Sequence, residues 1–240
     1  MASTSEVGHN KNVANFGYTC QIVTEMGALY APSNPSIKLP ALTTVNTGLI
    51  GSLQNINQKI PIYRNLVAER EIKMTNLRFL ATKIYNFSKS IAISKAEKEN
   101  VNRLVKKVRG DTKVKMVLDP TDTSSKTIST AQTSYDNTID FFDKLIDQID
   151  SYPEYIPNED DLKIVNLKLM YDDLKNLNNE VNASIITLIT ARKQRNDLLY
   201  FNDDNAIRLV RDIKSYLKSL GADALPYYKA VVALKLRKSL

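Results

Sequence analysis

The chain lacks most of the residue types on which enzymes and metalloproteins depend. Its 240 residues include one histidine, one cysteine and no tryptophan. A lone Cys20 excludes an internal disulfide and a cysteine-rich metal site. His9 by itself cannot supply the Glu-x-x-His pairs of a di-iron bundle or a zinc site of usual composition. A Ser-His or Cys-His nucleophile pair would have to combine His9 with a partner from a distant helix. No Gly-rich phosphate loop is present. We therefore predict a non-enzyme with no cofactor and no metal.

Turn-forming residues and long apolar runs are also scarce. Seven glycines and eight prolines are few for this length, which favours helices over a sandwich or barrel. The longest near-apolar stretches, around 185–189 and 230–234, fall far short of the roughly 20 residues that span a bilayer. The polar first ten residues do not predict a secretory signal. We expect no transmembrane segment and a cytoplasmic location by default, with signal-less export left open.

Two long amphipathic segments dominate what is present. After the turn at 30–34, apolar residues recur at steps of three and four over 42–67. After the turn at 155–159 the same rhythm covers 167–188. This spacing predicts long helices that each bury one face.

The other boundaries follow from caps and breakers. We expect the first long helix at about 36–72 with Pro61 inside it, then a break near 73–76 before a return helix. Asn158 is expected to cap the second long helix. The remaining predicted helices are 13–29, 96–109 ended by Gly110, 131–151, 206–220 closed by Gly221, and a last one that begins at Pro226.

The two long segments also match each other in sequence. Tyr155 follows Tyr30 by 125 positions, and the same interval separates two further pairs of repeat markers, Pro32 with Pro157 and Arg70 with Arg195. Beyond residues 202–205 the interval becomes 129, as a four-residue loop insertion would produce. Any two amphipathic helices align in their apolar positions, but the matched Tyr-x-Pro turns favour a duplication.

The predicted fold class is all-α, with two tandem, internally duplicated antiparallel helical-bundle units built on long coiled-coil-like helices. The predicted division is a polar N-terminal arm at 1–12, a first helical unit at 13–110, a linker at 111–130 and a second helical unit at 131–240. Below, the two predicted units are called the first and second repeat.

Three segments carry a family resemblance. Gly8–Phe16, Tyr30–Asn34 and Tyr155–Asp160 resemble an uncharacterised family of duplicated α-helical bacterial proteins, and the resemblance covers nearly the whole chain. It implies a duplicated all-helical fold and a bacterial source. It implies no activity, cofactor or functional residue.

An acidic stripe is expected beside the apolar face of the helix at 131–151. Like charges at these spacings repel by a few tenths of a kcal/mol per pair. The stripe is interpreted first as a solvated helix face, and alternatively as an electrostatic docking face or a weak divalent-cation site. Its members, at steps of four, three, four and three, are Asp136, Asp140, Asp143, Asp147 and Asp150.

The matching basic residues lie near the end of each repeat. They could bind nucleic acid in a salt-dependent way, but no interleaved aromatics or docking motif support that use. They could instead meet the acidic stripe, in the same chain or in a neighbour as a heterologous contact. The first cluster is Arg103, Lys106, Lys107, Arg109, Lys113 and Lys115, and the second is Arg208, Arg211, Lys214, Lys218, Lys235, Arg237 and Lys238.

These observations favour a non-catalytic helical structural or interaction protein that self-associates through complementary acidic and basic faces. Its expected partner is a second copy of the chain or another protein. One alternative is a helical effector or pore-forming toxin acting at membranes, although no apolar hairpin of bilayer length is present. A second alternative is sequence-independent nucleic-acid binding.

Overall fold

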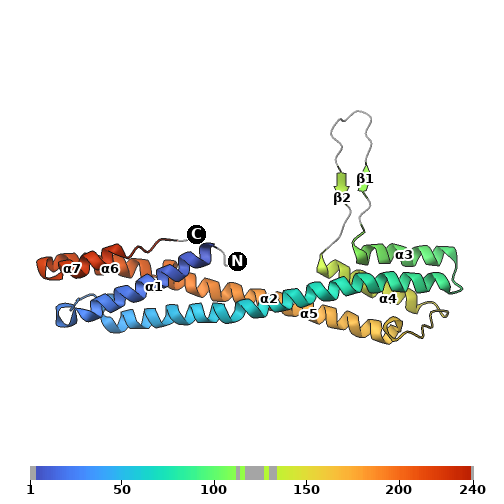
Figure 1. Cartoon of the computed structure of the whole chain (residues 1–240), viewed down its shortest axis with the longest axis horizontal. Helices are drawn as coiled ribbons and strands as arrows, with labels where there is room; N and C mark the ends of the chain where they lie inside the picture. The colour runs from blue at the N-terminus through green and yellow to red at the C-terminus, as the bar shows by residue number, and fades with distance from the viewer. Residues whose placement is uncertain (1–3, 112–113, 117–126, 130–133, 239–240) are drawn as a thin grey trace, which may run out of the picture. The chain divides into compact units, whose positions relative to one another are not determined.

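The chain folds into helices, as predicted, with one additional pair of short strands (Figure 1). The computed structural model describes residues 4–111, 114–116, 127–129 and 134–238. Its α-helices are α1 (Thr4–Glu25), α2 (Leu39–Ser90), α3 (Lys95–Arg109), α4 (Tyr135–Asp150), α5 (Ile164–Asn196), α6 (Ala206–Ser219) and α7 (Leu225–Ala233).

The N-terminal segment is helical from Thr4 onward, so the predicted polar arm at 1–12 is wrong where the structure describes it. Two of the polar side chains in this stretch, His9 and Asn12, are buried and hydrogen-bonded, as is Asn15 one turn further on. His9, Asn12 and Asn15 are 5%, 4% and 9% exposed and contact polar groups from distant parts of the sequence. A polar segment can therefore pack inside a fold when every polar group finds a partner.

Helix α2 is one continuous helix of 52 residues. The predicted break near 73–76 is wrong, because the buried stripe continues through Met74, Leu77 and Ala81 without interruption. No glycine or proline lies there to end the helix. Pro61 lies inside the helix, as predicted.

The chain packs as two compact units whose boundaries differ from those of the predicted repeats. Compact unit 1 is Met1–Ile62 with Ile185–Leu240, and compact unit 2 is Tyr63–Ser184. Each compact unit therefore contains residues from both predicted repeats. Both long helices contribute to both units, so a boundary drawn at a sequence linker does not separate the two cores.

Each compact unit has its own apolar core. Burying one large apolar side chain contributes about 1.5–3 kcal/mol, so these clusters supply the main stabilisation of each unit. In compact unit 1 the fully buried side chains include Phe16, Leu42, Leu49 and Ile213. In compact unit 2 they include Leu77, Ile84, Phe142, Leu145, Ile146 and Leu167.

Two buried tyrosines close the turns that precede α2 and α5. The Tyr30 hydroxyl donates to the Ile37 carbonyl at 2.7 Å, and the Tyr155 hydroxyl donates to the Leu162 carbonyl at 3.2 Å. Each accepting carbonyl ends a short 3₁₀ turn, η2 (Pro35–Ile37) or η3 (Asp160–Leu162), before the long helix begins. Burial raises the pKa of both phenols.

Three of the predicted helix ends are confirmed, whereas the predicted helix at 13–29 is observed at Thr4–Glu25. Gly110 and Gly221 have φ of 76° and 73°, the left-handed conformation that glycine adopts without strain. Pro226 lies in the first turn of α7. The predicted cap at Asn158 is wrong, because α5 begins at Ile164, after η3.

The predicted linker at 111–130 contains two strands that the sequence pattern did not indicate. Strand β1 (Val114–Met116) pairs with β2 (Thr127–Ser129) in an antiparallel register that sets Lys115 opposite Ile128. The linker therefore has secondary structure of its own.

Helix α5 continues into a π-helical segment, η4 (Asp197–Phe201). The wider turn buries Leu199 and Tyr200 and leaves Phe201 56% exposed. Segments of this kind often occur at functional sites. Here it directs the Tyr200 hydroxyl to within 2.8 Å of the His9 ring.

Replacing Tyr30 by Phe should lower the free energy of unfolding by about 1–2 kcal/mol, because the buried Ile37 carbonyl loses its hydroxyl donor. Tyr155→Phe should have a similar effect through Leu162. Urea unfolding followed by circular dichroism measures both. Tyr18→Phe is the matched control, because Tyr18 is 55% exposed. Equal stability of all three variants would contradict a structural role for the two turns.

Candidate interaction surfaces

The acidic stripe lies on α4, opposite the face that this helix buries. Phe142, Leu145 and Ile149 point into the core of compact unit 2. The stripe consists of Asp136, Asp140, Asp147 and Asp150, which are exposed, and Asp143, which is half-buried.

Two lysines already neutralise part of the stripe. Lys144 lies 2.5 Å from Asp140 one turn along α4, and Lys168 of α5 lies 2.8 Å from Asp150. The hydrogen bond to Asp150 raises the pKa of Lys168, and two neighbouring aspartates of the stripe add to the shift. Exposed pairs of this kind contribute little stability, but they occupy charges that a partner would otherwise contact.

The described part of the first basic cluster lies on α3. Arg109 pairs with Asp111 at 3.3 Å, and Arg103 donates to Asn100. Lys113 and the side chain of Lys115 lie outside the described residues. The cluster's exposed members on α3 are Arg103, Lys106, Lys107 and Arg109.

Helices α3 and α4 pack together, yet no ion pair joins the acidic stripe to the described part of the basic cluster. The contact between the two helices includes an aromatic ring of α4, Phe141, with a lysine from each helix beside it. The ammonium of Lys107 lies 4.5 Å from the centre of the Phe141 ring, and that of Lys144 lies 5.5 Å from it. Pairing between these two predicted surfaces is therefore not what holds α3 on α4.

Arg70 joins three helices of compact unit 2. Its Nη1 donates to Asn178 Oδ1 at 2.8 Å, and Asn178 Nδ2 donates to Asp136 at 2.6 Å. Its guanidinium lies 3.9 Å from the centre of the Tyr135 ring. The first aspartate of the stripe is thus part of a polar bridge between α2, α5 and α4.

The repeat markers differ in how closely their surroundings match. Pro32 and Pro157 are both buried beside their tyrosines. Arg195 is only 2% exposed and donates through Nε and Nη2 to Asn196 at 3.1 and 3.0 Å, whereas Arg70 is bound to Asn178. Each arginine thus donates to an asparagine side chain, Arg70 across two helices and Arg195 to its neighbour in the sequence.

Compact unit 2 also carries an apolar surface that the sequence pattern did not reveal. On α2, Ile72 and Phe79 are 62% and 72% exposed, and on α5, Val165 and Leu169 are 70% and 62% exposed. These four side chains are called the α2–α5 apolar face below. Val165 and Leu169 each lie two residues from the buried Leu167, about 200° around the helix. The face is therefore opposite the core.

Two ion pairs show that both halves of this face lie along one stretch of the surface. Lys73 contacts Asp173 at 2.6 Å, and Lys83 contacts Asp161 at 2.7 Å. Phe79 lies between the two lysines in α2. The two exposed apolar residues of α5 lie between the two aspartates. The helices therefore run side by side in opposite directions. Phe79, Val165 and Leu169 occupy the interval between the ion pairs, and Ile72 lies next to Lys73, just outside it.

Charges at the edge of the face differ between the two helices. Arg78 is exposed on α2, next to Phe79, and Asp172 is exposed on α5, one turn from Leu169. Neither forms an ion pair with another described residue. The edge on α2 thus carries an unpaired positive charge and the edge on α5 an unpaired negative one.

The described residues contain no group of three or more His, Cys, Asp or Glu side chains placed to hold a metal ion. Cys20 is half-buried, and burial raises the pKa of its thiol to about 11, so little reactive thiolate forms at neutral pH. None of the described helices is both long and apolar enough to cross a bilayer.

Comparison of the chain with protein-family models, with curated proteins and with solved structures finds no match. The function is therefore inferred from the chain's own side chains and their surroundings.

Asn178→Ala should lower the free energy of unfolding by about 1–3 kcal/mol, because Arg70 and Asp136 lose the amide that bridges them. Asn178 is 3% exposed, so water does not readily replace the amide. Thermal unfolding of compact unit 2 in the full chain measures the effect. The control is Asn179→Ala at the adjacent exposed position, and a control that destabilises equally would contradict the bridge.

Proposed function

We propose that the chain is a non-catalytic helical interaction protein that self-associates through the α2–α5 apolar face. The observation that carries the proposal is the exposure of Phe79, Val165 and Leu169 between two ion pairs, with the exposed Ile72 next to the first of them. A surface patch of large apolar side chains within a polar rim is typical of a protein interface. Phe79 is the aromatic residue of this face and its most exposed member.

A second copy of the chain fits this face because the face is complementary to itself. A two-fold axis parallel to the helices places α2 of one copy on α5 of the other, so the same residues are used on both sides. That arrangement brings the Arg78 edge of one copy toward the Asp172 edge of its partner. An arrangement with α2 on α2 would instead face like charges. The charge pattern therefore favours a dimer in which unlike helices meet.

The self-association and electrostatic complementarity expected from the sequence are retained in this proposal. The contact surface is now the α2–α5 apolar face and its edge charges, in place of the acidic stripe and the basic cluster. Asp140 and Asp150 of the acidic stripe are engaged by lysines of the same chain, and Asp136 accepts a hydrogen bond from Asn178. Lys107 of the basic cluster covers Phe141. These groups are less available to a partner than the unpaired edge charges.

We also infer that the chain is an internal duplication whose repeats exchange helices. The support is that each buried turn tyrosine packs edge-on against an aromatic of the other repeat. Tyr30 lies 5.4 Å from Tyr216, and Tyr155 lies 5.1 Å from Phe87, between ring centres. Tyr216 follows Phe87 by 129 positions, the interval that relates the return helices. Each antiparallel bundle would then combine the turn of one repeat with the return helix of the other.

The double variant Phe79→Gln with Leu169→Gln should raise the dimer dissociation constant by about tenfold or more, because it removes apolar side chains from the centre of the interface. Sedimentation velocity over a range of protein concentrations measures the constant. The matched control is Ile50→Gln with Val232→Gln, which alters two exposed apolar residues of compact unit 1. A wild-type chain that stays monomeric at every concentration, or equal weakening in both variants, would overturn the proposal.

Reversing one edge charge tests the orientation of the dimer. Arg78→Glu and Asp172→Lys should each weaken association about two- to fivefold through unfavourable charge contacts. The combined variant should recover most of the lost affinity, because opposite charges again face each other. The same measurement in high salt should reduce all these differences. Additive losses in the combined variant would exclude the pairing of α2 with α5.

A further inference from the structure

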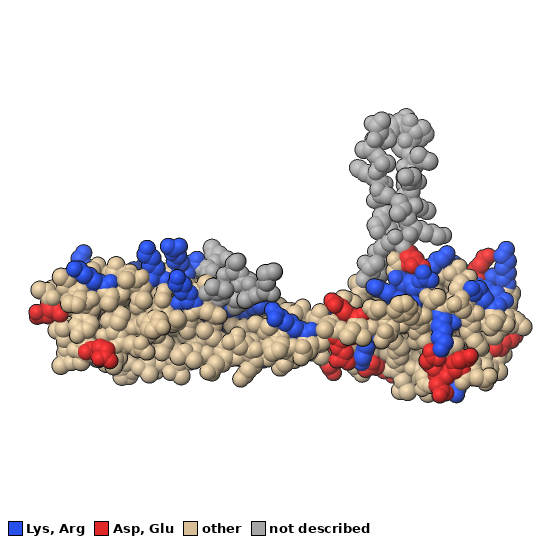
Figure 2. All heavy atoms as spheres, viewed as in Figure 1, with Lys and Arg blue, Asp and Glu red and all other residues tan. Residues whose placement is uncertain are grey.

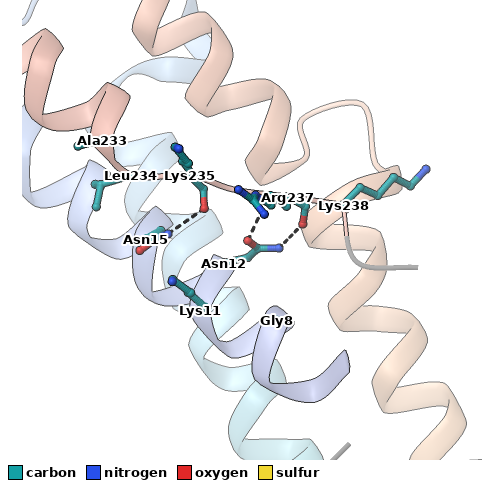
Figure 3. A pocket seen from close by; sticks show the side chains of 9 residues that line it. All are labelled: Gly8, Lys11, Asn12, Asn15, Ala233, Leu234, Lys235, Arg237 and Lys238. Atoms are coloured by element: carbon teal, nitrogen blue, oxygen red, sulfur yellow. Dashed lines mark hydrogen bonds between the residues drawn. The ribbon is translucent and has the colours of Figure 1, made fainter. Parts of the chain in front are cut away.

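The C-terminal segment of compact unit 1 is fixed along α1 (Figure 3). After α7 ends, residues Leu234–Lys238 follow an irregular path with no helix of their own. Leu236 packs against the core, whereas Lys235 and Arg237 remain exposed. The two cations on either side of Leu236 are thus held at the surface.

Two buried asparagines of α1 fix the backbone of this segment. Asn12 donates to the Arg237 carbonyl at 2.6 Å and accepts from the Arg237 amide at 3.1 Å. Asn15 donates to the Lys235 carbonyl at 2.9 Å. These bonds resemble the pairing of one strand with another and set which residues face outward.

A second layer of hydrogen bonds holds Asn12 itself. Its amide also donates to the Tyr200 hydroxyl at 2.8 Å, and that hydroxyl bonds His9 Nδ1 at 2.8 Å. Tyr200 is presented by the π-helical segment η4. The position of the Arg237 backbone therefore depends on a buried network that joins α1 to the end of α5.

The fixed segment and α1 border an open hollow of about 540 Å³ that is lined by cations. Its charged lining residues are Lys11, Lys235, Arg237 and Lys238, and no described residue that lines it is acidic. None of these four cations forms an ion pair with another described residue; the ammonium of Lys238 lies 4.7 Å from the centre of the Phe201 ring. Like charges around one hollow repel each other unless an anion is present.

The net charge of the chain is concentrated in the same compact unit. Compact unit 1 contains 14 Lys and Arg against 7 Asp and Glu, whereas compact unit 2 contains 19 of each. The whole formal charge of +7 thus belongs to the unit with the hollow. Figure 2 shows mainly basic side chains on the visible face of this unit and mixed charges on the other. Such a field raises the local concentration of anions.

We propose that this hollow binds a small anion that carries several phosphate groups. Lys and Arg are the side chains that bind phosphate most strongly, and Arg can do so through two parallel hydrogen bonds. The positive charge of four such side chains is enough to balance more than one phosphate group. The cations come from two segments that border one hollow, which favours a compact anion over an extended nucleic-acid strand that follows a charged groove.

Isothermal titration calorimetry of the full chain with inorganic tripolyphosphate tests the site. Wild type should bind one tripolyphosphate per chain. Lys235→Gln with Arg237→Gln should weaken binding about tenfold or more, because two charged hydrogen-bond donors are lost. Lys235→Arg with Arg237→Lys should retain most of the affinity. Absence of binding to wild type would overturn the proposal.

The matched control is Lys218→Gln with Lys229→Gln, which removes the same charge from exposed positions of compact unit 1 outside the hollow. At physiological salt, which screens distant charges, this control variant should change the tripolyphosphate affinity by less than about twofold. Equal losses in the two double variants would show binding to the overall field and overturn the site. The proposed site would also be overturned if an oligonucleotide bound more tightly than tripolyphosphate and lost affinity equally in the two double variants.

The test is independent of the proposed dimer. The hollow lies in compact unit 1 and the apolar face in compact unit 2, so Phe79→Gln with Leu169→Gln should bind tripolyphosphate like wild type. Failure of either proposal is therefore seen in its own measurement.

Discussion

The continuous apolar stripe along α2 is the constraint on which the rest of the fold depends. Leu42 and Leu49 bury one end of this helix in the core of compact unit 1, and Leu77 and Ile84 bury the other end in the core of compact unit 2. A helix with apolar residues on one face must cover that face throughout its length. The covering helices of compact unit 1 come from both ends of the sequence, whereas the core of compact unit 2 is built from the single segment Tyr63–Ser184.

Burial of one face leaves the opposite face to carry interactions. On α2 and α5 that outer face contains both large apolar side chains and unpaired charges of opposite sign, which is the basis of the proposed dimer. On α4 the outer face is acidic but largely engaged by lysines and an asparagine of the same chain. A candidate interface therefore differs from a solvated helix face in two ways: its apolar side chains are exposed, and its charged side chains have no partner within the described chain. The number of charges does not distinguish them.

Buried polar groups have a separate role in compact unit 1. His9, Asn12 and Tyr200 form a network in which each group has a hydrogen-bond partner, and this network fixes the segment that carries Lys235 and Arg237. A polar interior of this kind is stable only when its groups are paired. It allows a short irregular segment to present cations in a defined position without a helix or a sheet.

Local rules in the sequence determined the helical class, the stops at Gly110 and Gly221, the start of α7 and the position of Pro61 inside a helix. These features depend on the spacing of apolar residues and on the backbone preferences of single residues. Tertiary structure decided the rest. The unbroken α2, the burial of His9 and Asn12, the composition of the two compact units and the exposure of Phe79 all depend on which distant segments pack together. Sequence spacing places a residue on a helix face, but only the neighbouring helices determine whether that face meets a core, a partner or water.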